Sequence, residues 1–586
     1  MRFVALSLCL FIGLMTTGQV LANSVETGAT PEQSAFFNSP LGVLSDQDVA
    51  RYREIFNLQE KGAWKKADAK ISALENDILM GHVLYQRYLH PTAYRSKFSE
   101  LKKWMAFYAD HPNASKIYRL AQKRRPRRAS NPVRPIPRKW RGTEAFQLHP
   151  DLKADQQKVS VSRLRQIEGR VRYLIRRENA STALKEIKRH LQNNRITKRQ
   201  YDRMRSWAAA SYYYQGYIDA AKRISTEVAN RNGETAVLAH WIAGLIAFRA
   251  GDMVTSHDHF STMSQIPYQD GPLRAGAGFW AARTALAAGR PEGITPNLEI
   301  AAGYPFTFYG QLAMAQLGQD YDFDWDGPTL TKDGFKRVAD AHPGVARAAA
   351  LVQVGRKSDA ELEMRRANGA IDDALDYDLM AIAMGLDLPA SQIEIALAGK
   401  GKHLEAGLFP IPEYTPNNGF QTDRAVIYAL MRQESKFRLD AKSRVGARGL
   451  MQLMPRTASF VANDRSLRRQ SGRDRLYDPG LNLQIGQTYV NQLITRYTDG
   501  DLFKTAVAYN GGPGNLRRWD KRLDIEDPLL FIESIPNSES RDFVEKVLTN
   551  VWVYRNRLGQ PAPTRQKVAA GELPLYEAVD QLAESQ

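Results

Sequence analysis

Apolar residues recur at helical spacing along most of this chain. Between about residues 45 and 400, apolar positions return every three or four residues in Ala-rich segments that short turns separate. Such spacing places apolar side chains on one face of a helix, where they can be buried together. The pattern therefore predicts an all-α protein built from many short helices.

Three of these segments resemble one another: "WAAASYYYQGYIDAAKRI", "WIAGLIAFRAGDMVTSHDHF" and "FWAARTALAAGRPEGITPNL". Each has a tryptophan at its start and a glycine nine or ten residues later, and the tryptophans are 34 and 39 residues apart. This is the period of helix-pair repeats, in which an aromatic side chain packs beneath a small-residue turn. We expect an α-superhelical, tetratricopeptide-like solenoid, with ordinary helical packing around core tryptophans as the alternative. The pairs are Trp207 with Gly216, Trp241 with Gly251, and Trp280 with Gly289.

Residues 123–141, "KRRPRRASNPVRPIPRKWR", contain nine Lys or Arg residues, four prolines and no acid. The prolines exclude a continuous helix because proline lacks a backbone N–H and clashes with the preceding turn. We expect an exposed, extended crossing between helical blocks. The stretch either binds an anionic polymer or is a solvated linker.

A second interruption, "LEAGLFPIPEYTPNNGFQ" at 404–421, has three prolines and an Asn-Asn-Gly turn. We place the main domain boundary there, because 586 residues exceed what one hydrophobic core supports. The predicted division is a signal peptide at 1–22, the superhelical domain at 23–370, a helical linker domain at 371–414, a compact helical domain at 415–558 and a peripheral tail at 559–586.

The first 22 residues have the features of a secretion signal. Arg2 precedes the apolar run "FVALSLCLFIGLM", and "VLA" forms a small-residue cleavage site that ends at Ala22. The run is too short to span a membrane, and no later segment is a candidate. We expect export to a bacterial periplasm or cell envelope. Cys9 is the only cysteine, so the processed chain has no disulfides and depends on packing.

The chain is strongly basic, with a net charge of +18 that becomes +17 without the signal. Such a balance favours a polyanionic partner. Nucleic acid is one candidate, but an exported protein seldom meets it, and cell-wall polymer with free peptide carboxylates is more accessible. Charge alone does not choose between the two.

The C-terminal block lacks two of the common catalytic residue types, because the last histidine is His403 and no cysteine follows it. This excludes a Ser–His–acid triad, a thiol nucleophile and the usual zinc ligand sets within the block. Acid–base chemistry there must use carboxylates, tyrosines or lysines.

One carboxylate stands where the helical pattern requires an apolar residue. In "AVIYALMRQESKF", Glu434 falls seven residues after Ile427 and three after Met431, on a stripe that we extend to Phe437, with Thr422 or Asp423 as the N-cap. A carboxyl in apolar surroundings has a raised pKa, and a carboxyl still protonated near neutral pH can donate a proton. The alternative is that Glu434 ends the helix at the surface or pairs with a neighbouring arginine, Arg432 or Arg438.

Three further segments offer groups that suit a sugar-binding cleft. "GARGLMQLMP" (446–455) combines two loop glycines with the amide of Gln452, and "AVAYNGGPGN" (506–515) places Tyr509 and Asn510 just before a Gly-Pro-rich turn. "IPNSESRDFVEKVL" (535–548) has Glu539 near the start of a helix. Aromatic rings, amides and hydroxyls without a metal site are typical of saccharide recognition.

These four segments, in this order and at similar spacing, resemble the catalytic module of the soluble lytic murein transglycosylases, which has a goose-type-lysozyme-like fold. The resemblance covers about 415–558. The upstream solenoid is similar to the family's ring-like helical superdomain, and "FYGQLAMAQLG" (308–318) is similar to a stretch found there. The implied fold class is all-α, a superhelical solenoid followed by a lysozyme-like, mainly helical catalytic domain.

The resemblance also implies roles for individual residues. Glu434 would be the sole catalytic acid/base, and Glu539 would shape the cleft without acting as a second catalyst. Departures from the family's commoner residues at Gly511, Asn515 and Phe543 leave the reaction in place and put fine contacts in doubt. The implied substrate-binding residues are Ser443, Gln452, Met454, Tyr509, Asn510 and Glu539.

The implied reaction is a lytic cleavage of peptidoglycan that yields a 1,6-anhydromuramoyl product without water, cofactor or metal. Most glycosidases need two carboxylates. The remaining acids, Asp440, Asp464, Asp474 and Asp478, lie in polar stretches that do not place them opposite Glu434. We expect a monomer that acts on glycan strands and not on nucleic acid. The alternatives are a lysozyme-type hydrolase on the same fold, a non-catalytic wall-binding scaffold, and a nucleic-acid-binding repeat protein.

Overall fold

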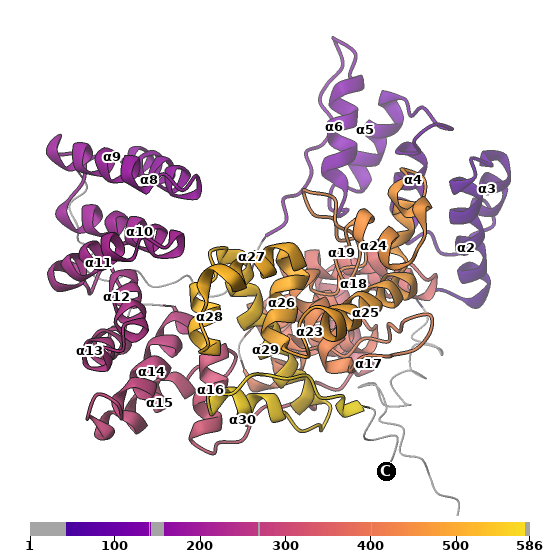
Figure 1. Cartoon of the computed structure of the whole chain (residues 1–586). Helices are drawn as coiled ribbons and strands as arrows, with labels where there is room; N and C mark the ends of the chain where they lie inside the picture. Colours follow the sequence, from indigo (N-terminus) through magenta and orange to yellow (C-terminus); the bar gives the residue numbers. More distant parts are fainter. Residues whose placement is uncertain (1–42, 140, 142–157, 268–269, 400, 581–586) are drawn as a thin grey trace, which may run out of the picture.

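The computed structural model describes residues 43–139, 141, 158–267, 270–399 and 401–580 (Figure 1). In these ranges the chain forms α-helices and short 3-10 turns, with isolated β-bridges in place of strands. The predicted all-α class is therefore confirmed. The predicted signal peptide at 1–22 lies outside the described residues. None of the described helices has the length and apolar character required to cross a membrane.

The N-terminal helices form a lobe that packs on a later part of the chain. Leu44, Tyr52 and Ile55 share one hydrophobic cluster with residues such as Val345 and Met364. Figure 1 shows the lobe (indigo to purple) beside the salmon-coloured helices α18 and α19. The lobe consists of α2 (Asp46–Glu60), α3 (Trp64–Ile71), α4 (Met80–Tyr88), α5 (Phe98–Phe107) and α6 (Ala114–Arg124).

Helix pairs continue the solenoid, and the three predicted repeats are three successive pairs. Trp207, Trp241 and Trp280 each lie in the first helix of a pair, and the glycine after each first helix has a positive φ, between 69° and 90°. The tryptophan rings pack between neighbouring helix pairs. Trp280, for example, stacks on Phe260 of the preceding pair, with 5.6 Å between the ring centroids. The predicted solenoid is confirmed. Its helices here are α8 (Val161–Arg176), α9 (Ala180–Gln192), α10 (Lys198–Gln215), α11 (Ile218–Asn232), α12 (Leu238–Arg249), α13 (Met253–Ser264), α14 (Gly271–Ala285), α15 (Ile294–Ala302) and α16 (Phe308–Gln316).

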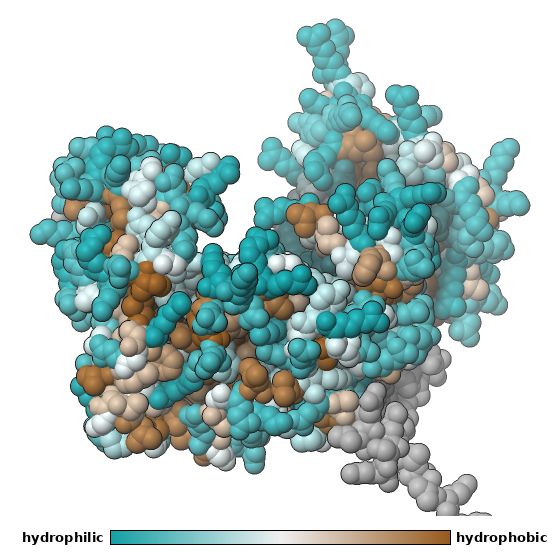
Figure 2. All heavy atoms as spheres, viewed as in Figure 1, coloured by the Kyte–Doolittle hydropathy of each residue, from teal (hydrophilic) through white to brown (hydrophobic). Residues whose placement is uncertain are grey.

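The chain then turns back toward the N-terminal lobe, so that the solenoid follows a curved path. Figure 2 shows a hollow between the α8–α9 end of the solenoid and the α5–α6 lobe. The returning helices are α17 (Lys332–Ala341), α18 (Pro343–Gln353), α19 (Lys357–Asn368), α20 (Asp376–Gly385), α21 (Pro389–Ala398) and α22 (Glu405–Leu408).

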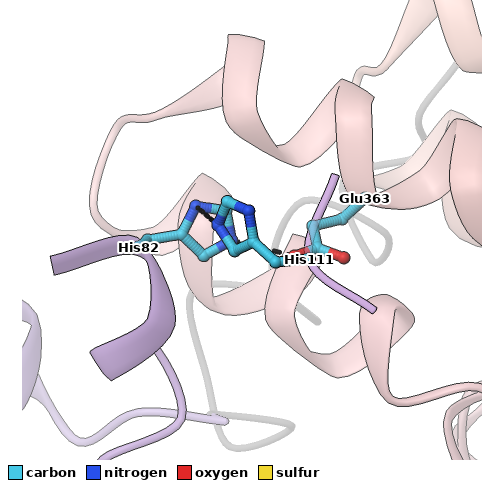
Figure 3. A group of neighbouring side chains, drawn as sticks. All are labelled: His82, His111 and Glu363. Carbon is cyan, nitrogen blue, oxygen red and sulfur yellow. Dashed lines mark hydrogen bonds and ion pairs between the residues drawn. The ribbon is translucent and has the colours of Figure 1, made fainter. Parts of the chain in front are cut away.

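A buried polar relay fastens the N-terminal lobe to α18 and α19 (Figure 3). His111 Nδ1 accepts the backbone N–H of Asn113 (3.0 Å), so its proton must be on Nε2, which donates to His82 Nδ1 (3.1 Å). His82 Nε2–H then donates to Glu363 (2.9 Å), which also accepts two bonds from Arg347 (2.9 and 3.0 Å).

In this geometry both histidines are neutral and every ring nitrogen has a hydrogen-bond partner. The same geometry decides whether the group is a metal site. His82, His111 and Glu363 are close enough to hold a cation together, and all three are buried. However, every ring nitrogen is already hydrogen-bonded, and the Arg347 guanidinium, which also bonds Asp110 (2.7 Å), opposes a cation at Glu363. We therefore interpret the group as a structural latch.

The basic stretch 123–141 begins with the last two residues of α6, and residues 125–139 have no helix, as predicted. Its last two arginines make contacts within the protein. Arg141 binds both carboxylate oxygens of Asp376 at 2.6 Å, and Arg138 pairs with Glu394 on α21. This part of the stretch is thus an extended strap across α19–α21.

The C-terminal helices surround α23, which is more deeply buried than a one-sided amphipathic pattern predicts. Every side chain from Ala425 to Met431 is buried, and α29 packs along α23. These helices are α23 (Arg424–Glu434), α24 (Pro455–Val461), α25 (Pro479–Arg496), α26 (Leu502–Gly511), α27 (Pro513–Leu523), α28 (Pro528–Ser534), α29 (Ser538–Arg557) and α30 (Pro563–Ala569).

The C-terminal helices and the solenoid share one continuous hydrophobic core. Phe308 on α16 stacks on Trp552 of α29 at 5.4 Å, and Tyr309 donates to the buried Glu533 of α28 at 2.5 Å. Burial of these side chains on both partners resists relative movement of the two parts.

We expected the segment after Gly559 to be peripheral apart from one short apolar stretch. Helix α30 packs against α16, and residues 576–580 reach the start of α23. There the Asp423 carboxylate accepts the backbone N–H groups of Val579 (3.0 Å) and Asp580 (3.1 Å) and pairs with the fully buried Arg555 (3.1 Å). Asp423 occupies the N-cap position of α23. Its side chain bonds these distant residues and does not make the expected hydrogen bond to the first turn of its own helix.

Candidate active site

Glu434 is the last residue of α23, and the helix stops there because the chain turns left-handed. Lys436 and Phe437 have φ values of 49° and 59°, which a continuing helix does not allow. The helix that carries the apolar stripe therefore ends before Phe437. The Phe437 ring is still buried, although the residue lies in the turn that follows the helix. The turn places Glu434 at the edge of the core, where it opens onto a cavity.

A cavity of about 360 Å³ brings together all seven residues that the sequence singled out. They come from the end of α23, the loop 443–454, the end of α26 and the first turn of α29. We call this space the Glu434 cavity. The predicted residues that line it are Glu434, Ser443, Gln452, Met454, Tyr509, Asn510 and Glu539.

No cation neutralises Glu434 among the residues that the structure describes. Arg432 points away and donates to the Leu408 carbonyl (2.7 Å) and to Asn550 (2.8 Å), while Arg438 donates to a backbone carbonyl of the turn. The alternative in which Glu434 pairs with either arginine is therefore wrong. Its carboxyl also accepts no hydrogen bond from a described residue, which leaves it available to a ligand.

Burial and, to a smaller extent, the negative charge of Glu539 together raise the pKa of Glu434 to about 8. The carboxyl is thus protonated at neutral pH and can give up a proton there. Glu539 lies in the first turn of α29 and is exposed. The two carboxyl groups of the cavity therefore have different environments. This difference suits one of them to donate a proton and the other to supply a supporting negative charge.

Gln452 presents a hydrogen-bond acceptor. Its Nε2 donates to the backbone carbonyls of Ala441 (3.0 Å) and Gly449 (2.9 Å), so both amide protons are used and Oε1 remains. Its φ of 45° is left-handed, which is unusual for a residue other than glycine and is common at binding sites.

Asn510 presents the complementary donors. The hydroxyl of the fully buried Ser540 donates to Asn510 Oδ1 at 2.7 Å, which fixes the orientation of the amide. The N–H groups of Nδ2 remain, and Asn510 lines the cavity. The cavity therefore holds a fixed acceptor and a fixed donor beside the acid.

Tyr509 contributes a ring and not a free hydroxyl. Its hydroxyl donates to the Met451 carbonyl (2.8 Å), and its ring stacks on Phe543 at 6.1 Å. Burial raises its pKa well above the usual value, and the charge of Glu434 adds to this. The phenol therefore stays protonated and acts as a fixed wall.

The loop 443–454 is held in shape by its own backbone. The Ser443 N–H donates to the Ala447 carbonyl at 3.0 Å, and Ser443 Oγ accepts the Ala447 N–H at 3.0 Å, which leaves the Ser443 hydroxyl proton free to donate. Gly449 has a φ of 76°, and a Cβ there would lie 2.3 Å from the Leu476 carbonyl oxygen. Met454 is 38% exposed and forms an apolar edge.

The sequence analysis missed one aromatic wall of the cavity. Tyr489, from the middle of α25, packs 5.6 Å from Tyr509 and lines the cavity. Its position in a helix rich in buried residues gave no local signal. Val445 of the loop and Thr457 of α24 also line the cavity, and Val445 is 78% exposed.

The other acids of this region lie elsewhere. Asp464 pairs with Arg475 (2.9 Å), Asp474 with Arg448 (3.2 Å), and Asp478 caps α25. Glu539 is thus the only second carboxylate among the described residues that line the Glu434 cavity.

Comparison with known proteins gives this geometry a family context. Residues 415–529 match the family model of the transglycosylase SLT domain. The soluble lytic murein transglycosylases of Escherichia coli and Salmonella typhimurium are each 30% identical to the chain, over 260 and 262 residues. Each alignment covers 43% of this chain and 39% of the relative, so the chain spans about two fifths of the length of these curated relatives.

Solved structures extend the likeness to nearly the whole chain. The 70 kDa soluble lytic transglycosylase of Escherichia coli superposes with a TM-score of 0.55 at 18% identity, over 88% of this chain and 97% of that one. The lytic transglycosylase Slt of Pseudomonas aeruginosa, solved as an inactive glutamate-to-glutamine mutant, gives a TM-score of 0.53 at 20% identity, over 92% and 90%. Residues 415–529 are therefore similar to the transglycosylase SLT domain, and the chain as a whole shares its fold with these soluble lytic transglycosylases.

Proposed function

We propose that this protein is a peptidoglycan lytic transglycosylase that cleaves the β-1,4 bond between N-acetylmuramic acid and N-acetylglucosamine. One observation supports this most strongly: Glu434 is protonated at neutral pH, has no cation partner among the described residues, and opens onto a cavity lined with amides and aromatic rings. The transglycosylase SLT domain match over 415–529 supports the same conclusion.

In the first step Glu434 donates its proton to the glycosidic oxygen, and the bond from that oxygen to the anomeric carbon breaks. The N-acetylglucosamine leaves with a free hydroxyl. The positive charge at the anomeric carbon is relieved by the substrate's own N-acetyl oxygen, so no second carboxylate is needed.

In the second step the Glu434 carboxylate removes the proton of the muramoyl 6-hydroxyl, whose oxygen attacks the anomeric carbon. The product is a 1,6-anhydromuramoyl end, and Glu434 returns to its acid form. No water is consumed, and the apolar walls around Glu434 protect the intramolecular attack from competing water.

The substrate-binding residues have complementary roles in this proposal. Gln452 accepts a sugar N–H or O–H, while Asn510 and Ser443 donate to sugar oxygens. Met454 and Tyr509 pack against the apolar faces of the rings. Glu539 keeps the pKa of Glu434 high and shapes the cleft.

A lysozyme-type hydrolase is the second candidate, because Glu539 lines the same cavity and could activate a water. The two reactions differ by one water in the product. Muropeptide analysis by mass spectrometry, with wild type and Glu434→Gln side by side, tests both. We expect anhydro products from the wild type and none from the variant. Products heavier by one water, or turnover by Glu434→Gln, would refute the proposal.

The proposal includes the setting of the enzyme. A processed periplasmic protein with the predicted signal peptide at 1–22 would meet glycan strands directly, and we propose that it works as a monomer without a cofactor. Residues 415–558 would form the catalytic domain, and residues 23–370 and 371–414 would form the superhelical and linker domains that hold the strand.

A further inference from the structure

The first turn of α29 contacts both the Glu434 cavity and the solenoid. On the cavity side, the Ser540 hydroxyl donates to Asn510 Oδ1 at 2.7 Å and so fixes the amide that lines the cavity. The next residue, Arg541, contacts the solenoid, because its guanidinium lies over the ring of Tyr214 on α10, 3.7 Å from the ring centroid. Two consecutive residues therefore link the cavity to a solenoid helix.

The Tyr214 ring is a major partner of the Arg541 guanidinium. Arg541 Nη1 also donates to the Ile535 carbonyl, but among the residues that the structure describes no acid forms an ion pair with it. Carboxyls are nevertheless close, since burial raises the pKa values of Glu533 and Glu545 and the Arg541 cation opposes this effect. Without the ring, the guanidinium would be free to turn toward these acids.

The end of α10 also holds the two helices that precede α29. Arg522 of α27 donates to the Tyr214 carbonyl (2.9 Å), and the Tyr213 hydroxyl bonds the buried Ser534 of α28 (2.7 Å). The Tyr213 and Tyr214 rings lie edge to face at 5.3 Å, so one contact supports the other. Figure 1 shows α28 on the side of the C-terminal helices that faces the solenoid.

This contact lies between two groups of the cavity along the chain. Helices α27 and α28 connect α26, which ends with Asn510 and Gly511, to α29, whose first turn carries Glu539. A shift of that turn would move Glu539 and loosen the hydroxyl–amide bond that fixes Asn510. The position of both cavity groups therefore depends on what holds the start of α29.

We propose that Tyr214 is a positioning residue for the reaction: its ring holds Arg541 and thereby keeps Ser540 and Glu539 in place at the Glu434 cavity. The solenoid would then contribute to the chemistry through this contact, apart from any contact of its own with substrate. This inference rests on the proposed function for its kinetic test and on the structure alone for its second test.

The kinetic test compares substitutions at Tyr214 in the full-length protein. Tyr214→Ala should lower kcat for release of anhydromuropeptides about tenfold, because a small displacement of cavity groups costs that much or more, while KM changes less than about twofold. Tyr214→Phe keeps the ring and should match wild type. Tyr214→Leu fills the same space without an aromatic face and should lose as much kcat as Tyr214→Ala, which covers the case of an alanine variant that does not fold.

Two further variants check the route. Arg541→Ala should lower kcat to a similar extent, and Tyr214→Ala should add nothing in that background, since both remove one contact. The matched control is Tyr201→Ala, which removes another tyrosine of α10 whose ring lies beside an arginine, Arg205, at 5.3 Å. This pair does not involve α29, so the control should leave kcat unchanged.

The second test needs no activity. The titratable groups that face Glu434 are Glu539 of α29 and Tyr509 of α26. If Tyr214→Ala lets Glu539 move away, the pKa of Glu434 falls. The unfolding free energy of the Glu434→Gln protein, relative to its Glu434 parent, should therefore level off at a lower pH with Tyr214→Ala than with Tyr214.

Three outcomes would overturn the inference: wild-type kcat and an unchanged levelling pH in folded Tyr214→Ala or Tyr214→Leu, a loss in Tyr214→Phe as large as that in Tyr214→Ala, or an equal loss in Tyr201→Ala. Circular dichroism confirms that each variant is folded. The proposed function is decided separately, since it fails if wild type releases no anhydro product, whereas the levelling pH still decides whether Tyr214 positions the cavity groups.

Discussion

Glu363 in the latch and Glu434 in the candidate active site are the same residue type in buried surroundings, yet their pKa values move in opposite directions. Burial raises the pKa of both, but at Glu363 the bonds from His82 and Arg347 more than offset it and lower the pKa to about 2. Glu434 has no such donors within the described residues, and its pKa rises to about 8.

The difference shows which buried carboxylates of this fold can take part in a reaction. A buried carboxylate with all its hydrogen bonds made stabilises the structure and cannot react, whereas one with none keeps its proton for a substrate. The following predictions test this comparison in order of decreasing effect.

Glu434→Gln should have the largest effect on activity. Loss of the proton donor should reduce kcat by about 10²–10⁴-fold or more, since general acid–base catalysis contributes that much. The fold should be retained and gain stability at pH 8, because an amide has no charge to bury. Release of anhydromuropeptides and thermal unfolding measure the two effects. A variant that lost stability along with activity would break the comparison.

Glu363→Gln should have the largest effect on stability. It leaves Arg347 and the His82 relay without the buried anion, which should cost about 3 kcal/mol of unfolding free energy. The matched control is Asp340→Asn, whose exposed pair with Lys336 should contribute little to the unfolding free energy. Urea unfolding gives both values, and kcat of the folded variant should match wild type. Equal costs for the two variants would contradict the latch.

The pH dependence separates the two sites. The rate should fall about tenfold per pH unit above about pH 8, as Glu434 ionises. The raised pKa of Glu434 means that its contribution to stability is complete below pH 4.5 and is lost as the pH rises through 8. The lowered pKa of Glu363 has the reverse sign, so its contribution is present above pH 4.5 and is lost as the pH falls toward 2.

Unfolding free energies across this range, for wild type and Glu434→Gln, provide the measurement. The unfolding free energy of the variant, relative to that of wild type, should rise steadily between pH 4.5 and pH 8. A difference that stayed constant over this interval would show that Glu434 does not titrate with a raised pKa.

Glu539→Gln should have the smallest effect. Removing the negative charge of Glu539, the smaller cause of the raised Glu434 pKa, should move the alkaline limb of the rate profile to lower pH, while anhydro products persist. Asp542→Asn, an exposed acid on the same helix, is the control. A loss of kcat as large as that of Glu434→Gln would instead support two catalytic carboxylates and hydrolysis.

Local sequence patterns predicted the parts of the molecule that local forces form. The Trp-to-Gly spacing predicted three helix pairs, because the repeat buries a ring against the next pair and needs a positive φ at the turn. Glu434 was visible as a break in an apolar stripe. The extended course of residues 125–139 followed from their prolines.

Contacts between distant segments were not predictable from spacing. His82 meets Glu363 across 281 residues, and Asp423 meets Val579 across 156, and neither pair breaks a local pattern. The same holds for Tyr489, which reaches the Glu434 cavity from a helix with ordinary periodicity. The packing of the segment after Gly559 was not predicted for the same reason, because its short apolar stretch did not indicate which residues it would contact.

The contact between Asp423 and residues 579–580 has a consequence for the order of folding. The helix that ends in the acid begins at a carboxylate whose backbone partners are among the last described residues. On a chain synthesised N-terminus first, the solenoid can assemble early, but this helix is anchored only after residues 579–580 have been made. A nascent polypeptide would thus complete the solenoid before it fixes the helix that carries Glu434.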